Sequence, residues 1–254
     1  AIASSALAFK RAALMTATKV TVKPPSEEVL RARDNFKDFC AAMGKPPAKH
    51  MLEWHHELCT GQDSECLMGI GGPNTAILAP RGSAKSTVLG LFAAWMIGRH
   101  TAAKQMLRIL YIAYMVDISR AKSATIKGIL TSNKYREIFP MVRLSKIKRS
   151  DEYWSIDYDF AGIDTAGEEA FTIACGGLKG AITSKRSQLV LIDDPIKSAA
   201  SINNPDIRRE MEQTWSNVIA PTMFQGARAI CLGTRFHFND IHATLFVPKN
   251  NWKQ

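Results

Sequence analysis

The stretch from Thr75 to His100 reads TAILAPRGSAKSTVLGLFAAWMIGRH and decides the fold. It begins with a short apolar run, which is typical of a buried parallel strand, and a tight polar turn follows. Lys85-Ser86-Thr87 and a long apolar helix pattern come next. Strand, loop, lysine, hydroxyl and helix in this order are typical of a phosphate-binding P-loop. The stretch therefore predicts an α/β domain organised around a nucleotide.

Two positions depart from the usual P-loop pattern GxxxxGK[ST]. Ala79 and Ala84 stand where glycines are expected, although Gly82 keeps one permissive backbone position. Lys85 would contact the outer phosphates, and the Ser86 hydroxyl would ligate Mg²⁺. A basic turn between strand and helix, without a nucleotide, is the alternative. The expected phosphate-binding residues are Arg81, Gly82, Ser83, Ala84, Lys85, Ser86 and Thr87.

Composition favours one large domain with a polyanionic partner. The chain has 254 residues, is 46% hydrophobic and carries a formal charge of +10. This charge does not separate DNA from RNA or acidic lipid. The five cysteines are scattered and form no CxxC pair, which is typical of a reduced intracellular protein. No apolar run is long enough to cross a membrane, so no membrane partner is expected.

Strand and helix patterns alternate along the rest of the chain. Arg108–Tyr114 and Arg228–Leu232 predict strands, and Asp117 is expected to cap the helix after the first of them. Ser26 is expected to cap an earlier helix that ends near Gly44. We therefore expect a P-loop NTPase of the ASCE type, with a central, mainly parallel sheet flanked by helices.

The middle of the chain, residues 146–181, contains short strand patterns, a glycine-rich segment and a basic cluster. Tyr153–Asp159 and Phe171–Ala174 predict a hairpin-like antiparallel addition to the sheet. Gly176–Ala181 is expected to form a flexible loop. Lys146, Lys148 and Arg149 form a basic cluster that is either a contact for backbone phosphates or a solvated loop.

The second half of the site follows another buried strand. Leu189–Ile192 runs directly into Asp193-Asp194-Pro195. Ligands of open α/β sheets bind at the carboxyl ends of strands, and we expect this strand beside the P-loop strand. Asp193 would then hold Mg²⁺ and Asp194 would activate the attacking water. Ordinary turn chemistry at Asp-Asp-Pro is the alternative.

Other polar residues are candidates for the same edge. Thr234 and Arg235 follow a buried strand, where a hydroxyl and a guanidinium would sense the terminal phosphate. His237, Asp240 and His242 suggest a polar loop rather than a metal site, because no further ligand is evident. Arg186 is a candidate arginine finger for a neighbouring subunit. The competing candidates for that finger are Arg120, Arg143 and Arg149.

Three segments together resemble a known family. APRGSAKST, GGLKGAITSKRSQLVLIDDPIK and CLGTRFHFNDIHATL resemble, in order and wording, the ATPase domain of tailed-phage large terminase subunits, the DNA-packaging motors. The resemblance spans roughly 49–245. It implies that 81–87 is the Walker A loop, that Asp193 is the Walker B acid and that Asp194 replaces the usual catalytic Glu. It also implies that Thr234 couples hydrolysis to movement, and that Trp54 and His55 lie where an aromatic–Gln pair often contacts adenine.

The resemblance also implies partners and a domain plan. The expected function is hydrolysis of ATP with Mg²⁺ to move double-stranded DNA into a procapsid, by a homo-oligomeric ring, expected to be a pentamer, with portal protein and small terminase subunit. The expected location is the host cytoplasm, outside the mature virion. Residues 1–48 would form an arm and helix, 49–245 the ATPase domain and 246–254 the start of a linker or lid toward a nuclease domain. We expect that nuclease domain to be absent from this chain, so DNA cleavage is not expected. A helicase-like motor and a non-hydrolysing DNA-binding scaffold are the alternatives.

Overall fold

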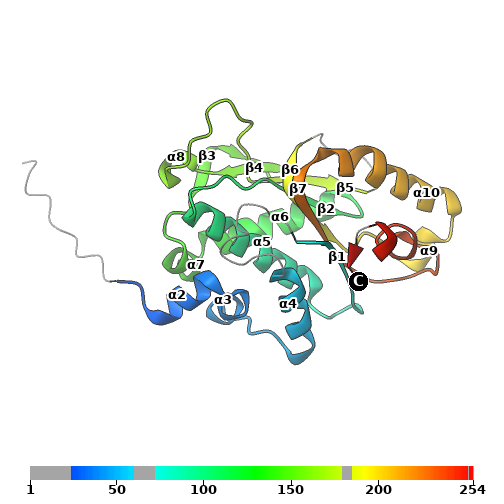
Figure 1. Ribbon diagram of the computed structural model, residues 1–254, viewed down its shortest axis with the longest axis horizontal. Helices are drawn as coiled ribbons and strands as arrows, with labels where there is room; N and C mark the ends of the chain where they lie inside the picture. The colour runs from blue at the N-terminus through cyan, green and yellow to red at the C-terminus, as the bar shows by residue number, and fades with distance from the viewer. Residues whose placement is uncertain (1–23, 60–71, 179–184, 251, 254) are drawn as a thin grey trace, which may run out of the picture.

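A sheet of eight strands forms the middle layer of the molecule (Figure 1). The computed structural model describes residues 24–59, 72–178, 185–250 and 252–253. The strands are β1 (Asn74–Leu78), β2 (Ile109–Ala113), β3 (Leu144–Arg149), β4 (Tyr153–Ile156), β5 (Ile173–Gly177), β6 (Ser187–Asp193), β7 (Met223–Gly233) and β8 (Trp252–Lys253).

The strand order is β3-β4-β5-β2-β6-β7-β1-β8. From β5 to β8 every pairing is parallel, whereas β4 is antiparallel to β5 and β3 is antiparallel to β4. The prediction of a mainly parallel sheet with an antiparallel addition is confirmed. The expected contact between β6 and the P-loop strand β1 is wrong, because β7 lies between them and pairs with both.

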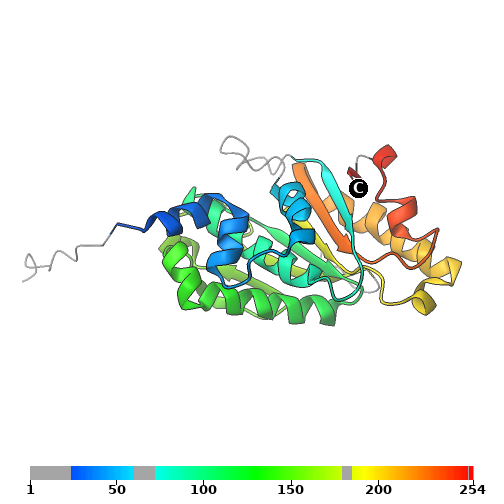
Figure 2. The same ribbon diagram turned by 90° about the horizontal axis from the view of Figure 1, so that it is seen from below.

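Helices cover both faces of this sheet (Figure 2). The helices drawn from blue to green gather on one face and α10 lies on the other. The first group comprises α2 (Glu27–Asp34), α3 (Phe36–Ala42), α4 (Leu52–Cys59), α5 (Lys85–Ala102), α6 (Val116–Thr131) and α7 (Asn133–Ile138). The remaining α-helices are α8 (Tyr158–Ala161), α9 (Ala199–Ile202), α10 (Pro205–Thr214) and α11 (Ile241–Thr244). Shorter turns are Lys49–Met51, Ala220–Thr222 and Pro248–Asn250, and a π-helical turn covers Trp215–Ile219.

The uninterrupted apolar runs are strands buried on both faces. In β6, Leu189 and Leu191 pack in the core cluster that contains Phe92 of α5. The alternate residue Val190 packs in the opposite cluster with Trp215. Successive side chains of a strand point to opposite faces, so helices on both sides make every position apolar. The prediction that this run is a buried strand is confirmed.

Two helix caps differ from the expectation, one between α2 and α3 and the other at the start of α6. Ser26 caps α2 as predicted, but Asn35 ends this helix and its side chain caps α3 through the amide of Asp38. Asp117 is not the cap of α6. Met115 holds that position without a side-chain bond, and Asp117 lies in the first turn, where it pairs with Arg120.

Part of one expected loop and the basic cluster, for which a loop was one of two alternatives, belong to strands. Gly176 and Gly177 end β5 rather than opening a loop, and the residues from 179 to 184 lie outside the described ranges. A Cβ on Gly177 would approach the amide nitrogen of Val116 at 2.7 Å, so this glycine serves close packing. Lys146, Lys148 and Arg149 lie on β3 at the sheet margin.

The described ranges contain no helix that is both long and apolar enough to cross a bilayer. The same ranges hold no cluster of three or more residues suited to a metal ion. Cys40, Cys59, Cys175 and Cys231 are free thiols.

Candidate nucleotide-binding site

A cavity of about 530 Å³ opens where the parallel strands end. The P-loop leaves the end of β1, Asp193 closes β6, and Thr234 follows β7. Because these three strands are neighbours and run the same way, their carboxyl ends meet at one edge. The cavity is lined by Arg81, Gly82, Ala84, Lys85, Ser86, Thr87, Tyr114, Ile118, Lys122, Asp193, Asp194, Ile196, Lys197 and Phe236.

The loop between β1 and α5 uses two left-handed backbone positions. Gly82 has φ of 81° and Ala84 has φ of 59°. Glycine adopts this region freely, whereas a Cβ strains it by roughly 1–2 kcal/mol. Ala84 is also the N-cap of α5, so its conformation sets the direction in which the helix starts. The predicted loop therefore forms without the second glycine, but with a strained alanine.

The Lys85 ammonium lies at the centre of the loop. Its Nζ donates to the carbonyl oxygens of Pro80 at 2.8 Å and Ala79 at 3.2 Å. Asp194 Oδ1 lies 3.7 Å from the same nitrogen, and Lys85 is 4% exposed. The free amides at the start of α5 add partial positive charge nearby. The cavity thus combines a buried cation with a helix N-terminus, the pair of features that binds phosphate.

Asp193 is a buried carboxylate with two hydroxyl donors. Ser86 Oγ donates to its Oδ1 at 2.9 Å and the Tyr111 hydroxyl donates to its Oδ2 at 3.0 Å. Asp193 is 2% exposed, and burial raises the pKa of its carboxyl above the usual range while the two hydrogen bonds oppose this shift. Both oxygens of the carboxylate are therefore fixed in position.

These oxygens suit magnesium. Mg²⁺ binds carboxylate and hydroxyl oxygens and keeps several waters, so it needs few protein ligands. Asp193 Oδ1 and Ser86 Oγ lie side by side at the margin of the cavity. The chemistry of this donor pair fits the expected metal, and a divalent cation would offset the cost of burying the carboxylate.

The adjacent carboxylate has a different environment. The Asp194 side chain is 42% exposed to the cavity, and the residue has φ of 42°. Its amide donates to the carbonyl of Leu232 on β7 at 2.9 Å. Thr234 Oγ1 lies 3.3 Å from Asp194 Oδ1 and 3.0 Å from the Ala79 carbonyl oxygen. The Thr234 hydroxyl therefore links the P-loop to Asp194.

Of the two arginines predicted at this edge, Arg81 lines the cavity and Arg235 does not. The Arg81 guanidinium donates to the Lys197 carbonyl oxygen and lies 5.0 Å from the centre of the Phe236 ring. Arg235 is exposed and donates to the Phe238 carbonyl oxygen at 3.1 Å, outside the set of residues that line the cavity. Ser83 is also outside this set, and its hydroxyl donates to the Pro80 carbonyl oxygen at 2.7 Å.

Three further candidates lie away from the phosphate cavity. Arg186 precedes β6 at the amino edge of the sheet, opposite the P-loop, with its guanidinium 5.1 Å from the centre of the Phe224 ring. Trp54 lines a separate cavity of about 650 Å³ along β1. His55 stacks on Phe36 in the core, and burial lowers its pKa to about 4. Their roles in catalysis and base binding remain predictions.

Sequence reasoning missed several residues of the site. Tyr111 fixes Asp193 from β2, and Tyr114 and Lys122 line the cavity from the neighbouring β2–α6 connection and helix. Lys197 and Phe236 approach from loops after β6 and β7. Tyr114 is the last residue of the predicted strand 108–114 and directly follows the observed β2, and this position at a strand end is the one signal that could have found it.

Relief of the strain at Ala84 is measurable. We expect Ala84→Gly to raise the free energy of unfolding by about 0.5–1 kcal/mol, because the strain removed outweighs the added chain entropy. Chemical denaturation without nucleotide tests this. Ala103→Gly is the matched control, since Ala103 has φ of −79° at the other end of α5 and should be neutral or destabilising. Equal destabilisation by both changes would contradict strain at Ala84.

Comparisons with known proteins give fold-level likenesses. No protein-family model matches the chain, nor does any curated protein. The structure is similar to a variant of the large terminase ATPase domain of Thermus phage P74-26, at 16% identity and a TM-score of 0.46, over 80% of this chain and 70% of that one. It is also similar to the N-terminal domain of the bacteriophage phi29 DNA packaging ATPase, at 14% identity and a TM-score of 0.41, over 71% and 81%.

A third likeness is to the large terminase of bacteriophage HK97, at 13% identity and a TM-score of 0.46, over 86% of this chain and 40% of that one. Since these TM-scores lie below 0.5, we base no functional conclusion on them. The strand order and the loop between β1 and α5 agree with the predicted P-loop fold, and the wording of the three motifs resembles that of the ATPase domain of phage large terminase subunits.

Proposed function

We propose that this domain hydrolyses ATP to move double-stranded DNA, as the ATPase domain of a packaging motor. The observation that carries the proposal is the difference between two adjacent carboxylates opposite one lysine. Asp193 is buried against the Ser86 hydroxyl, whereas Asp194 faces the cavity 3.7 Å from Lys85. One carboxylate can therefore hold a cation while the other remains available to a water.

Each residue then has a distinct part in the reaction. Lys85 and the amides of 82–86 hold the phosphates and offset their charge. Asp194 accepts a proton from the attacking water, whose oxygen forms a bond to the terminal phosphorus as the bond to ADP breaks. The Thr234 hydroxyl fixes the position of Asp194 relative to the start of the P-loop. Ser86 and Asp193 would hold Mg²⁺, which would neutralise phosphate charge when bound.

The base and the transition state need further groups. We propose that Trp54 packs against the adenine ring, since its cavity adjoins the strand that leads into the P-loop. Arg186 lies at the opposite edge of the sheet from its own P-loop, so it could reach a phosphate only in a neighbouring subunit. We propose a ring in which the Arg186 of each subunit completes the nucleotide site of the next.

The DNA-packaging part of the proposal rests on the motif wording and on charge. A chain of +10 favours a polyanion, and the three motifs resemble those of large terminases. A homo-oligomeric pentameric ring, a portal protein and a small terminase subunit are the partners proposed on the same ground. They would assemble in the host cytoplasm.

The test is Mg²⁺-dependent ATP hydrolysis as a function of protein concentration. We expect turnover per subunit to rise with concentration, because a neighbour completes the site. Asp194→Asn should reduce turnover by about a hundredfold or more while nucleotide affinity changes little, since it removes the base but keeps the shape. Asp194→Glu is the matched control, because it restores a carboxylate and should retain substantial turnover.

Each outcome is decisive. Turnover per subunit that does not change with protein concentration would exclude an arginine supplied by a neighbouring subunit. Full turnover in Asp194→Asn would show that another group is the base. ATP binding without hydrolysis at any concentration would favour a non-hydrolysing scaffold. Strand separation by the protein would favour a helicase-like motor, because packaging motors move along duplex DNA without unwinding it.

A further inference from the structure

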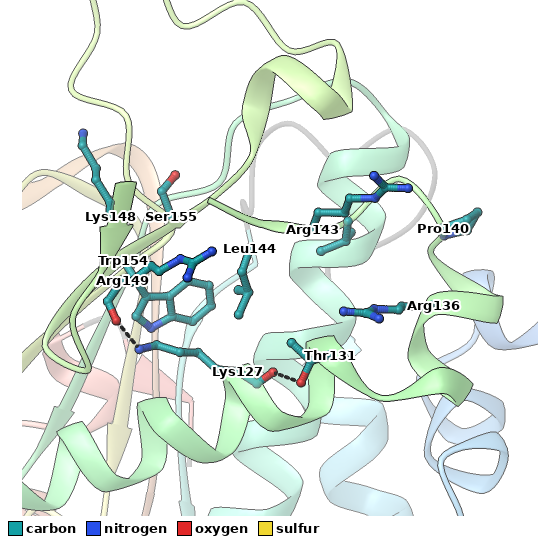
Figure 3. A pocket seen from close by; sticks show the side chains of 11 residues that line it. Lys127, Thr131, Arg136, Pro140, Arg143, Leu144, Lys148, Arg149, Trp154 and Ser155 are labelled. Atoms are coloured by element: carbon teal, nitrogen blue, oxygen red, sulfur yellow. Dashed lines mark hydrogen bonds between the residues drawn. The ribbon is translucent and has the colours of Figure 1, made fainter. Parts of the chain in front are cut away.

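A second cavity lies at the antiparallel end of the sheet, away from the P-loop. It has a volume of about 770 Å³. Its walls are the C-terminal half of α6, helix α7, the connection to β3, and strands β3 and β4 (Figure 3). We call it the basic pocket. Its lining residues are Lys127, Thr131, Arg136, Pro140, Val142, Arg143, Leu144, Lys148, Arg149, Trp154 and Ser155.

The charge of the basic pocket has one sign. Five of its eleven lining residues are Lys or Arg, and none is acidic. Figure 3 shows Arg136 and Arg143 on one side of Leu144, and Arg149 with the Trp154 ring on the other. The cations therefore surround an apolar floor rather than lying along one exposed helix. This arrangement concentrates positive potential in a concave space.

Four of these cations form no salt bridge in the described part of the chain. Arg143 lies 3.6 Å from the centre of the Phe160 ring, Lys148 donates to the Ala170 carbonyl oxygen, and Arg149 donates to the Ser145 carbonyl oxygen. Arg136 is exposed at the end of α7. Neutral partners orient a cation without cancelling its charge.

Some cations elsewhere in the described part of the chain form salt bridges. Arg108 pairs with Glu168, and Arg120 pairs with both Asp117 and Glu152. Lys185 likewise pairs with Glu169. Carboxylates are therefore available on this surface, but they lie outside the basic pocket. Within the described residues, Arg81, Arg208 and Arg235 also bond to backbone carbonyl oxygens without a salt bridge, so the distinctive feature of the basic pocket is that four cations without a salt bridge line one cavity.

Lys127 makes the frame of the pocket rigid. Its Nζ donates to the carbonyl oxygens of Arg149 and Ser150, both at 2.9 Å, and pairs with Asp151 at 2.6 Å. Trp154 is 1% exposed and donates to Ser123 of α6 at 2.6 Å. These bonds attach the β3–β4 turn to α6, so the side chains of β3 are presented on a fixed support.

We propose that the basic pocket binds the phosphodiester backbone of nucleic acid. Three of its four unpaired cations are arginines, whose planar guanidinium groups match phosphate oxygens in bidentate geometry. Contacts of this kind carry no base specificity. The inference rests on the proposed function, because a motor that moves along DNA must hold the backbone whatever the sequence.

The experiment removes two arginines that come from different walls. Arg136→Ala with Arg143→Ala, in the whole 254-residue chain, should weaken binding of a fluorescent 30-bp duplex about tenfold at 100 mM salt. The slope of log affinity against log salt should fall by about 2, for two lost phosphate contacts. The matched control is Arg31→Ala with Arg209→Ala, two exposed arginines outside both cavities that remove the same charge.

The readouts separate this site from the nucleotide site. Affinity for ATP should be the same in the pocket variant, the control and the wild type. Duplex binding equal to the control would overturn the proposal. Binding of poly-glutamate in preference to duplex would assign the pocket to an acidic protein partner, and competition by ATP or inorganic phosphate alone would assign it to a small anion, so either result would overturn it too.

A second measurement needs no variant. Phenylglyoxal modification of the wild-type chain, mapped by mass spectrometry, should show that duplex protects Arg136, Arg143 and Arg149 while Arg31 and Arg209 stay reactive. Uniform reactivity with bound duplex would overturn the proposal. If duplex protects these arginines and the chain binds no ATP, the basic pocket stands and the motor function fails, so the two failures are distinguishable.

Discussion

Lys85→Met should weaken ATP binding and lower any ATP turnover by about 100- to 1000-fold, the usual loss when a charge-stabilising donor is removed from a catalytic site. The ammonium is 4% exposed and is held by the Pro80 and Ala79 carbonyl oxygens at the mouth of the P-loop. Methionine keeps the length of the side chain and removes the charge. Equilibrium binding of labelled ATP measures the effect, because binding does not require a neighbouring subunit.

Two controls make this result specific. Lys134→Met removes an exposed lysine of α7 and should leave nucleotide affinity unchanged. A thermal melt of each variant separates loss of the site from loss of the fold, since Lys85 also satisfies two backbone carbonyls. Unchanged ATP affinity in folded Lys85→Met would show that this loop is not a phosphate site.

Arg228→Met should lower the free energy of unfolding by about 3–5 kcal/mol, the usual cost of breaking a buried charged network. Arg228 is fully buried in β7. Its guanidinium donates to the carbonyl oxygens of Pro73, Leu58 and Glu57 and to the Thr75 hydroxyl, at 2.7–2.9 Å. Removal would take one donor from each of these acceptors, although the Pro73 carbonyl oxygen would keep its bond from the Thr75 hydroxyl.

The expected loss of stability in Arg228→Met is large because Arg228 is charged and joins two elements. Burial lowers the pKa of Arg228 to about 10, so the side chain stays charged at neutral pH. Its bonds attach the end of α4 to the start of β1. Arg228→Lys should recover part of the loss, because one ammonium cannot reproduce the guanidinium fork. Arg209→Met, at an exposed site, is the control in urea denaturation, and equal stability of both Met variants would contradict the prediction.

Much of the fold was predictable because its strands are buried on both faces. The run at Leu189–Ile192 has no polar face, so the sequence alone indicates a central strand that ends in acids. Lys85, Ser86, Asp193 and Asp194 follow from strand ends and from one loop pattern. Local sequence carries this information because these residues lie directly after their strands.

The remaining features depend on contacts between distant segments. Nothing in the sequence around Arg228 indicates that β7 would pair with both β1 and β6. In the sequence, Tyr111 is one more residue of an apolar strand pattern. In the structure its hydroxyl lies 3.0 Å from Asp193 Oδ2. Gly177 looks like a loop glycine, whereas its small size is required by the amide of Val116. Pairing and packing partners of this kind cannot be read from one segment.

Helix α6 lines both the nucleotide cavity and the basic pocket. Ile118 and Lys122 in its first half line the nucleotide cavity, and Lys127 and Thr131 in its second half line the basic pocket. Its sixteen residues make one rod about 24 Å long. If binding of one ligand shifts this helix, the shift also changes the binding free energy of the other ligand. Linkage then requires equal factors in both directions: if duplex tightens ATP binding, ATP must tighten duplex binding by the same factor.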